Sequence, residues 1–235
     1  MNKQPLKRLF NTIGILLLSQ VAMHGAVVSW TNGAYTDNTV LSFAGTTGQV
    51  LYGVNLGGSA LTTANGYAFQ AGNSGSVTYV GFDIASPFLG GGSGTSTDTN
   101  FNSILGDANF FNTGDNTYTL NGLTAGVTYN VLFLMADTRT EEGIPGRSFI
   151  IGSESTTSSS QVYAFASAVP SLGGYALGTF TATGSTEVFN RNGTDGQLNG
   201  ILVAAVPEPS TSAMLILAGL GAVALLHKQR TSSRS

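Results

Sequence analysis

The chain has 235 residues, of which 9% are charged, 42% are hydrophobic and 32 are glycine. The charged fraction is far below the roughly 25% of soluble domains, but the abundance of apolar residues, including 13 Phe, excludes an intrinsically disordered chain. The absence of cysteine excludes a disulfide framework, so a folded domain must depend on its hydrophobic core.

Charge is distributed unevenly along the chain. Between Val27 and Val206 there are three arginines and eleven acidic residues, which give this stretch a net charge of −8. An acidic stretch of this kind repels the phosphates of nucleic acid, which excludes a nucleic-acid-binding function. The remaining basic residues lie near the two ends, a distribution that indicates membrane-facing ends and an exported centre.

The middle of the chain also lacks several reactive side chains. Both histidines (His24 and His227) and all lysines lie outside Val27–Val206. This excludes Ser-His-Asp and Cys-His catalysis, zinc sites built from His and Cys, and lysine chemistry of the Schiff-base or P-loop kind. Carboxylates remain, and glycoside hydrolysis needs a pair of them.

The first 26 residues have the three parts of a secretory signal peptide. A positive region (Lys3, Lys7 and Arg8) precedes an apolar run over Leu9–Val21, and small residues follow just before Val27. We therefore expect residues 1–26 to direct export and to be removed.

Residues 27–205 alternate short runs of β-forming residues with Gly, Asn, Asp and Ser turns, and no stretch has a convincing helical period. This pattern predicts an all-β domain, an antiparallel β-sandwich of jelly-roll or Greek-key type. A helical turn is expected at Phe101–Leu105, and tight turns at the Asn-Gly pairs that begin at residues 32, 65, 121, 192 and 199. The expected strands are Val27–Thr31, Thr39–Phe43, Gln49–Val54, Tyr67–Gln70, Val77–Asp83, Thr117–Asn121, Thr128–Ala136, Arg147–Ile151, Gln161–Ala166, Ala176–Ala182, Thr186–Asn190 and Gly200–Ala205.

Aromatic residues are the groups on which a saccharide would stack. Trp30 is the only tryptophan, and its place in an alternating strand favours the core over an exposed platform. Tyr35, Tyr52, Tyr163 and Tyr175 are further candidates, and none of them stands out.

The stretch from Leu89 through Asn100, which is glycine-rich over residues 89–94, has two interpretations. It is either a flexible linker between two domains or a long surface loop within one domain. We favour the loop, because the strands expected before it are too few to close a core of their own.

Acidic and amide side chains follow the glycine-rich residues 89–94. Asp98, Asn100 and Asp107 offer oxygen ligands of the kind that calcium prefers. The same residues favour turns with no ion, and the stretch has no EF-hand spacing. Calcium is the one cofactor that the sequence leaves open.

The sharpest structural motif runs from Tyr118 to Tyr129. It reads strand, then Leu-x-x-Gly-x-x-Tyr over residues 123–129, then a long apolar strand. This order resembles the tyrosine corner of Greek-key sandwiches. We expect Tyr129 to bury its ring and to hydrogen-bond through its hydroxyl to the preceding loop.

A charged loop follows the apolar strand. Asp137, Arg139 and Arg147 flank Glu141 and Glu142. Loops at strand ends often carry function, so this is the candidate ligand-contacting loop and the place where a carboxylate-dependent reaction would be sought. In the structural interpretation, Asp137 pairs with Arg139 or Arg147 and holds the loop closed.

The C-terminal segment, residues 206–235, has three consecutive parts. Val206-Pro207-Glu208-Pro209 is expected to form an exposed, stiff recognition segment, because proline blocks strand pairing and favours extended geometry. An apolar stretch at residues 212–226 follows and predicts a transmembrane helix, with neighbouring residues extending it to membrane width. The basic residues after it, which hold the C-terminus in the cytoplasm, are Lys228, Arg230 and Arg234.

This composite segment resembles the PEP-CTERM sorting signal, in which a Pro-Glu-Pro motif precedes a short hydrophobic helix and a basic tail. The resemblance implies that Pro207, Glu208 and Pro209 are recognised by a membrane enzyme, exosortase. That enzyme would cut near the motif and pass the protein to the cell surface or the extracellular polymer. The alternative is a plain single-pass membrane anchor.

Three functions remain open for the exported domain. The first is a non-enzymatic structural or adhesive protein of the cell surface or extracellular matrix. The second is a carbohydrate-binding module that acts on extracellular polysaccharide. The third is a carboxylate-dependent glycosidase or lyase. The lack of histidine, cysteine and lysine in the domain favours a function without catalysis.

Overall fold

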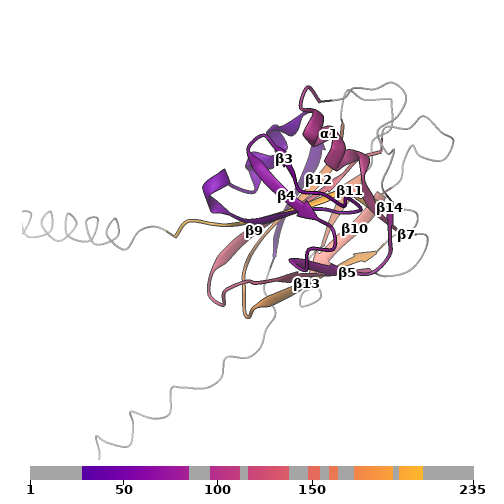
Figure 1. Cartoon of the computed structure of the whole chain (residues 1–235). Helices are drawn as coiled ribbons and strands as arrows, with labels where there is room; N and C mark the ends of the chain where they lie inside the picture. Colours follow the sequence, from indigo (N-terminus) through magenta and orange to yellow (C-terminus); the bar gives the residue numbers. More distant parts are fainter. Residues whose placement is uncertain are drawn as a thin grey trace, which may run out of the picture.

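The computed structural model describes residues 28–84, 96–111, 116–137, 148–153, 159–163, 172–192 and 196–208. These residues form mostly β-strands with few helices (Figure 1), which confirms the all-β prediction. The predicted signal peptide (residues 1–26) and the predicted transmembrane helix (residues 212–226) lie outside the described residues. Within the described ranges, no helix is long and apolar enough to cross a membrane.

The strands form sheets whose order differs from the order of the chain. The large sheet, sheet A, has the order β1 (Ser29–Tyr35), β12 (Gly173–Thr181), β9 (Thr128–Met135), β15 (Gly200–Ala205), β2 (Val50–Asn55), β4 (Tyr67–Ala71) and β3 (Thr62–Ala64). Sheet B has the order β11 (Ser159–Tyr163), β10 (Ser148–Ser153), β13 (Thr186–Asn192), β8 (Asn116–Asn121) and β5 (Val77–Tyr79). A small sheet C joins β14 (Gly196–Leu198), β7 (Ala108–Phe111) and β6 (Phe82–Ile84).

Sheet A is the middle layer of the molecule and is buried on both faces along its central strands. In β9, Val131 and Phe133 point into a core shared with sheet B. Leu132 and Leu134 point the other way, into a second core beneath the helices. This double burial explains the nearly continuous apolar run of β9, because a strand covered on both faces has no polar side.

The helical cover on the outer face of sheet A comes from two elements. The α-helix α1 (Thr99–Gly106) buries Phe101, Ile104 and Leu105, and the 3₁₀ helix η1 (Asn38–Phe43) buries Val40 and Leu41. A second 3₁₀ helix, η2 (Thr47–Gln49), leads into β2. Figure 1 shows α1 at the top of the molecule, near β3. The sandwich therefore has a third, partly helical layer.

Pairing in the sheets is almost entirely antiparallel, as predicted. Among the paired strands of the described ranges, β2 and β4 run parallel and the other pairs run antiparallel. The chain between β2 and β4 includes β3, which pairs with β4 through a tight turn. Because of this parallel pair, sheet A is a mixed sheet.

One predicted strand is wrong. Residues 39–43 form the 3₁₀ helix η1. Asp37 supplies the helix start, since its side chain accepts a hydrogen bond from the Thr39 backbone N–H at 2.9 Å. The adjacent residues Val40 and Leu41 are both buried, which suits a helical turn, whereas a strand would point them to opposite faces.

The Asn-Gly pairs behave differently from one another. Asn65 (φ 47°) and Gly66 (φ 81°) form the predicted tight turn between β3 and β4. The pair at residues 32–33 lies inside strand β1, where Asn32 is opposite Ala176. Asn199 and Gly200 also lack the positive φ expected of them, so the predicted turns at these two places are wrong.

The predicted strand Val77–Asp83 is two strands in different sheets, β5 and β6. Gly81 separates them with a φ of 125°, a conformation that side-chain-bearing residues rarely adopt. The glycine-rich residues 89–94 lie outside the described residues. The strands on either side of them, β6 and β7, pair with each other in sheet C.

Candidate functional site

The candidate site begins where the last strand of the fold ends. β15 lies between β9 and β2 in sheet A, and Ile201, Leu202 and Val203 are fully buried. Ala205 is paired with Tyr129 of β9. The Val206 backbone N–H then donates to the Thr128 carbonyl at 2.8 Å. The domain therefore holds the chain in extended form up to Val206.

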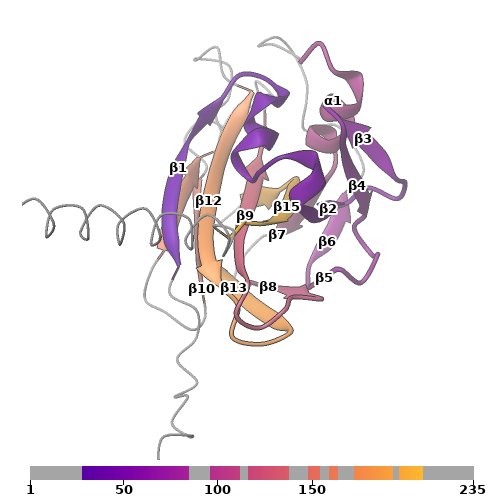
Figure 2. The same cartoon turned by 90° about the vertical axis from the view of Figure 1, so that its left-hand side faces the viewer.

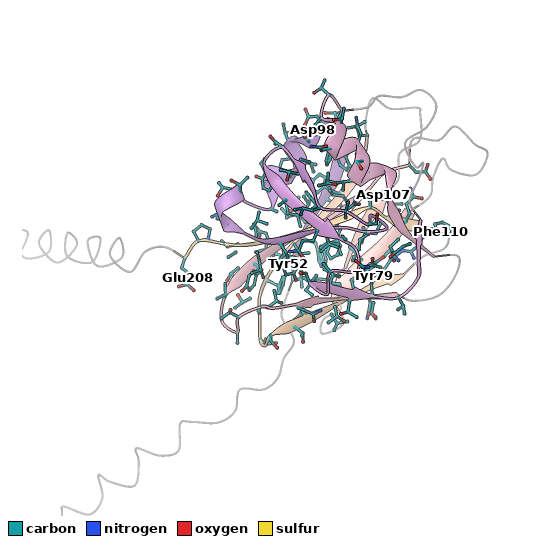
Figure 3. The ribbon with its side chains drawn as sticks, viewed as in Figure 1. Tyr52, Tyr79, Asp98, Asp107, Phe110 and Glu208 are labelled. Atoms are coloured by element: carbon teal, nitrogen blue, oxygen red, sulfur yellow. The ribbon has the colours of Figure 1, made fainter. Side chains whose placement is uncertain are left out.

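Beyond Val206 the chain is exposed. Pro207 and Glu208 are exposed to solvent, and Figure 3 shows Glu208 where the chain leaves the domain. Pro207 has no N–H with which to extend the pairing between β15 and β9. The exposure expected of this segment is observed at these two residues, and their role in recognition stays a prediction. Pro209 and the basic residues Lys228, Arg230 and Arg234 lie outside the described residues.

The tyrosine corner supports this exit point. The ring of Tyr129 is buried, and its hydroxyl accepts a hydrogen bond from the Thr124 backbone N–H at 3.0 Å. The predicted corner is thus confirmed. Because Tyr129 is the direct partner of Ala205, the corner fixes the strand against which the end of β15 is paired.

Of the residues in the candidate ligand loop, the structure describes only Asp137. Asp137 follows β9 and is fully buried. A carboxylate without exposed surface agrees better with the structural interpretation of this residue than with ligand contact. Arg139, Glu141, Glu142 and Arg147 lie outside the described residues.

The candidate calcium ligands are placed apart. Asp98 precedes α1 and Asp107 follows it, which separates them by about 13 Å along the helix axis. Asp98 caps the helix by accepting hydrogen bonds from the Asn100 and Phe101 backbone N–H groups. Asp107 accepts from the Asn55 amide at 3.0 Å, and Asn100 donates to the Thr63 carbonyl. The structure does not bring the three together (Figure 3 labels the two aspartates), and within the described ranges no group of three or more His, Cys, Asp or Glu side chains could hold a metal ion.

Sequence reasoning missed several buried polar residues, among them Arg191, Asn109 and Asn199. Arg191 is fully buried on β13. Burial raises the pKa of Tyr118, and the positive charge of Arg191 acts in the opposite direction. Tyr118 also donates to Asn109, which in turn donates to Asp83. The period-two alternation of β13 gave a signal for Arg191, since it shares the inward face with Phe189.

The aromatic candidates are mostly structural. Trp30 packs against the core, with its ring 5.9 Å from that of Phe189, as predicted. Tyr35 and Tyr52 are buried, and the side chain of Tyr163 is outside the described set. Tyr175 is half-buried and packs edge-on against Phe43, with ring centroids 5.2 Å apart. Phe43 was not a candidate from sequence, because its segment was expected to be a strand.

Comparison with known protein families identifies the C-terminal segment. A family model described as the PEP-CTERM protein-sorting motif matches residues 205–230. The match starts at the last residue of β15 and includes the exposed Pro207 and Glu208. No curated protein sequence matches the chain.

Comparison with solved structures shows a distant likeness of fold. A crystal structure of the plant peptide RALF23 in complex with FER and LLG2 is 12% identical, with a TM-score of 0.50, over 75% of this chain and 55% of that one. The ANXUR1 extracellular domain from Arabidopsis thaliana is 11% identical, with a TM-score of 0.48, over 68% of this chain and 49% of that one. A β-glucuronidase of Bacteroides uniformis is 16% identical, with a TM-score of 0.45, over 74% of this chain and 19% of that one. This chain spans about half the length of the chains in the first two of these structures, and at these identities the likeness concerns the fold alone.

Proposed function

We propose that this chain, which carries a PEP-CTERM protein-sorting motif at residues 205–230, is an exported protein whose β-domain is released at the cell surface by cleavage near that motif. Its partner in this step is an exosortase-type membrane enzyme, and the segment around Pro207 and Glu208 acts as the substrate of that enzyme. The signal peptide at residues 1–26 and the hydrophobic helix at residues 212–226 belong to the same proposal.

The observation that carries the proposal is the position of the motif relative to the fold. The last strand ends at Ala205, and the motif is exposed at Pro207 and Glu208. Cleavage on the C-terminal side of Val206 leaves every strand of the sandwich intact. Cleavage within β15 would remove a central strand of sheet A, so the fold and the sorting signal have compatible boundaries.

The proposed role of the released domain is structural or adhesive and requires no catalysis. Support comes from the sequence, which has no histidine, cysteine or lysine between Val27 and Val206. Carboxylates remain as groups for a glycosidase or lyase, and the candidates among them are Asp137, Glu141 and Glu142 of the charged loop. Turnover of any polysaccharide by the purified protein, lost in Glu141→Gln or Glu142→Gln, would replace this role with an enzymatic one.

The sorting proposal is tested by fractionation of the native cells. We expect wild-type protein outside the cell, and the double variant Pro207→Ala/Pro209→Ala in the membrane fraction with its tail. A matched control, Pro87→Ala, changes a proline far from the motif in the sequence and should leave the distribution unchanged. Release of the double variant at the wild-type level would contradict a role for the motif.

A second candidate function is the binding of extracellular polysaccharide. The observation that favours it is an aromatic pair on the outer face of sheet A, formed by the exposed Phe43 and the half-buried Tyr175. Aromatic rings at a protein surface suit ligands with an apolar face and a polar edge, as sugar rings have.

A further inference from the structure

Among the residues that the structure describes, no helix covers the outer face of sheet A along β1 and β12, which lie side by side in Figure 2. The pairs Ser29–Thr179, Thr31–Leu177 and Gly33–Tyr175 are directly opposite each other, so these side chains share one face. It is the outer face, since Tyr175 and Leu177 pack at the margin of the core beneath the helices. We call this surface, completed by Phe43, the open strip.

The helical layer stops at the border of the open strip. η1 ends at Phe43, and the next residue, Ala44, is tied to β9 because its carbonyl accepts from the Asn130 amide at 2.9 Å. This contact holds the end of η1 beside β12, so that the Phe43 ring packs edge-on against Tyr175 at an interplanar angle of 63°. Phe43 keeps 44% of its surface exposed.

Gly33 makes room for the Tyr175 ring. A Cβ atom at residue 33 would lie 3.1 Å from Cε1 and 3.3 Å from the hydroxyl of Tyr175, closer than ordinary contact. The ring therefore extends across β1 over the glycine. With Phe43 on one side and the backbone of β1 beneath it, the ring is held in one orientation, which reduces the entropy lost when a ligand stacks on it.

Hydroxyl groups border these rings. Thr31 and Ser29 are exposed on β1. On β12, the Thr179 hydroxyl donates to the Asn130 side-chain oxygen at 2.7 Å, and its lone pairs remain as acceptors. The strip thus combines an aromatic pair with a row of short polar side chains.

The sequences of the strip's elements contain no charged residue. β1 reads SWTNGAY, η1 reads NTVLSF and β12 reads GGYALGTFT. The stretch between Val27 and Val206 nevertheless has a net charge of −8. An uncharged strip on an acidic domain is poorly suited to an anionic ligand, which the rest of the surface repels.

We propose that the open strip binds a neutral polysaccharide, with sugar rings on Phe43 and Tyr175 and sugar hydroxyls on Thr31 and Thr179. This inference depends on the second candidate function and locates its site. The apolar faces of sugar rings fit the aromatic pair, and the hydroxyl row fits their polar edges. The absence of charge on the strip selects neutral over acidic polymers.

The test is affinity electrophoresis of the full-length chain purified from membranes in mild detergent, which makes it independent of sorting. The gels contain either hydroxyethylcellulose or the extracellular polysaccharide of the producing cells, separated by anion exchange into neutral and acidic fractions. We expect retardation in a neutral gel and none in the acidic one. Phe43→Ala should weaken binding about tenfold, because it removes an exposed aromatic anchor.

Matched variants separate binding from folding. Leu61→Ala truncates a side chain that is 70% exposed next to β3, on the opposite edge of sheet A, and should bind like the wild type. Thr31→Val keeps the size of the side chain and removes one hydroxyl, and it should weaken binding several-fold with unchanged stability.

The proposal is overturned if neither neutral gel retards the protein, if the acidic gel retards it more, or if Leu61→Ala and Phe43→Ala bind alike. The sorting proposal does not depend on any of these results.

Discussion

Asn199 connects three parts of the fold through its buried side chain. Its oxygen accepts from the Ala136 backbone N–H at 2.6 Å, and its amide donates to the carbonyls of Leu105 and Asp107 at 2.7 and 2.8 Å. These contacts tie the end of β9 and the end of α1 to the start of β15. The residue was expected in a tight turn, but its backbone is not in the positive-φ region.

Replacement of Asn199 by alanine should therefore be costly. The substitution leaves the Ala136 backbone N–H without its acceptor. It also removes a hydrogen-bond donor from the carbonyls of Leu105 and Asp107. We expect a loss of roughly 3 kcal/mol in the free energy of unfolding, since each unsatisfied buried group costs about 1–3 kcal/mol. Urea titration measures it, and Asn73→Ala, at an exposed turn position, serves as the control with a change below about 0.5 kcal/mol.

Asp98 is a second residue with several partners. Burial opposes its ionisation, but hydrogen bonds from the Asn38 amide and the backbone N–H groups of Phe101, Asn65 and Asn100 lower its pKa overall. A carboxyl group with a lowered folded-state pKa stabilises the protein above its unfolded-state pKa, near 4. That contribution is lost as the pH falls through the folded-state value.

The Asp98→Ala variant should show this pH dependence. Loss of the helix cap should cost about 1–2 kcal/mol at pH 7, measured by urea unfolding. The difference from the wild type should shrink as the pH falls below about 4, because protonation of Asp98 weakens the same hydrogen bonds. A difference that stays constant from pH 7 to pH 3 would show that the charge of Asp98 is not involved.

At the scale of elements, β15 completes the sandwich. It is the last strand of the described chain, yet it lies in the interior of sheet A with partners on both sides. Residues on its two faces enter both cores, Ile201 one and Leu202 the other. The fold therefore cannot close without residues that lie close to the sorting motif.

Two truncations test this dependence. A chain that ends at Val206 should fold, with an unfolding free energy within about 0.5 kcal/mol of that of the longer protein, because it keeps every strand. A chain that ends at Asn199 should not give a cooperative unfolding transition. Circular dichroism during urea titration distinguishes them, and a cooperative transition for the shorter chain would mean that β15 is dispensable.

The sequence predicted elements where local pattern and burial agree. β9 was expected from its apolar run, and the tyrosine corner from its spacing, and both are present. η1 was missed because β-branched Val40 suggested a strand, whereas the Asp37 cap decided the local geometry. Sheet order and the parallel β2–β4 pair depend on contacts between distant segments, which alternation along one strand does not encode.

For the whole molecule, the sorting segment was predictable because it is composite and continuous in sequence. Three parts in fixed order identify it without any knowledge of the fold. The aromatic pair was not predictable, because Phe43 and Tyr175 are brought together only by the packing of η1 on β12. Asp98 and Asp107 show the converse, since residues close in sequence are separated by α1.

The chain joins a folded β-domain to a C-terminal sorting motif that cleavage would remove. The domain holds the chain up to Val206, through the Val206–Thr128 hydrogen bond and the pairing of Ala205 with Tyr129. The enzyme that recognises the motif would act on the segment that follows, which is exposed at Pro207 and Glu208. The released product would be a sandwich with its central strand intact.

The most direct test of this claim is the intact mass of the protein recovered from the medium of its native cells. If the chain is cleaved near the sorting motif, we expect a single C-terminus at or after Val206 and before residue 212. β15 would then be complete and the hydrophobic segment at residues 212–226 absent. A mass that includes residues 212–226 would show that the tail is a permanent anchor. A C-terminus within Gly200–Ala205 would contradict the proposed boundary between the domain and the motif.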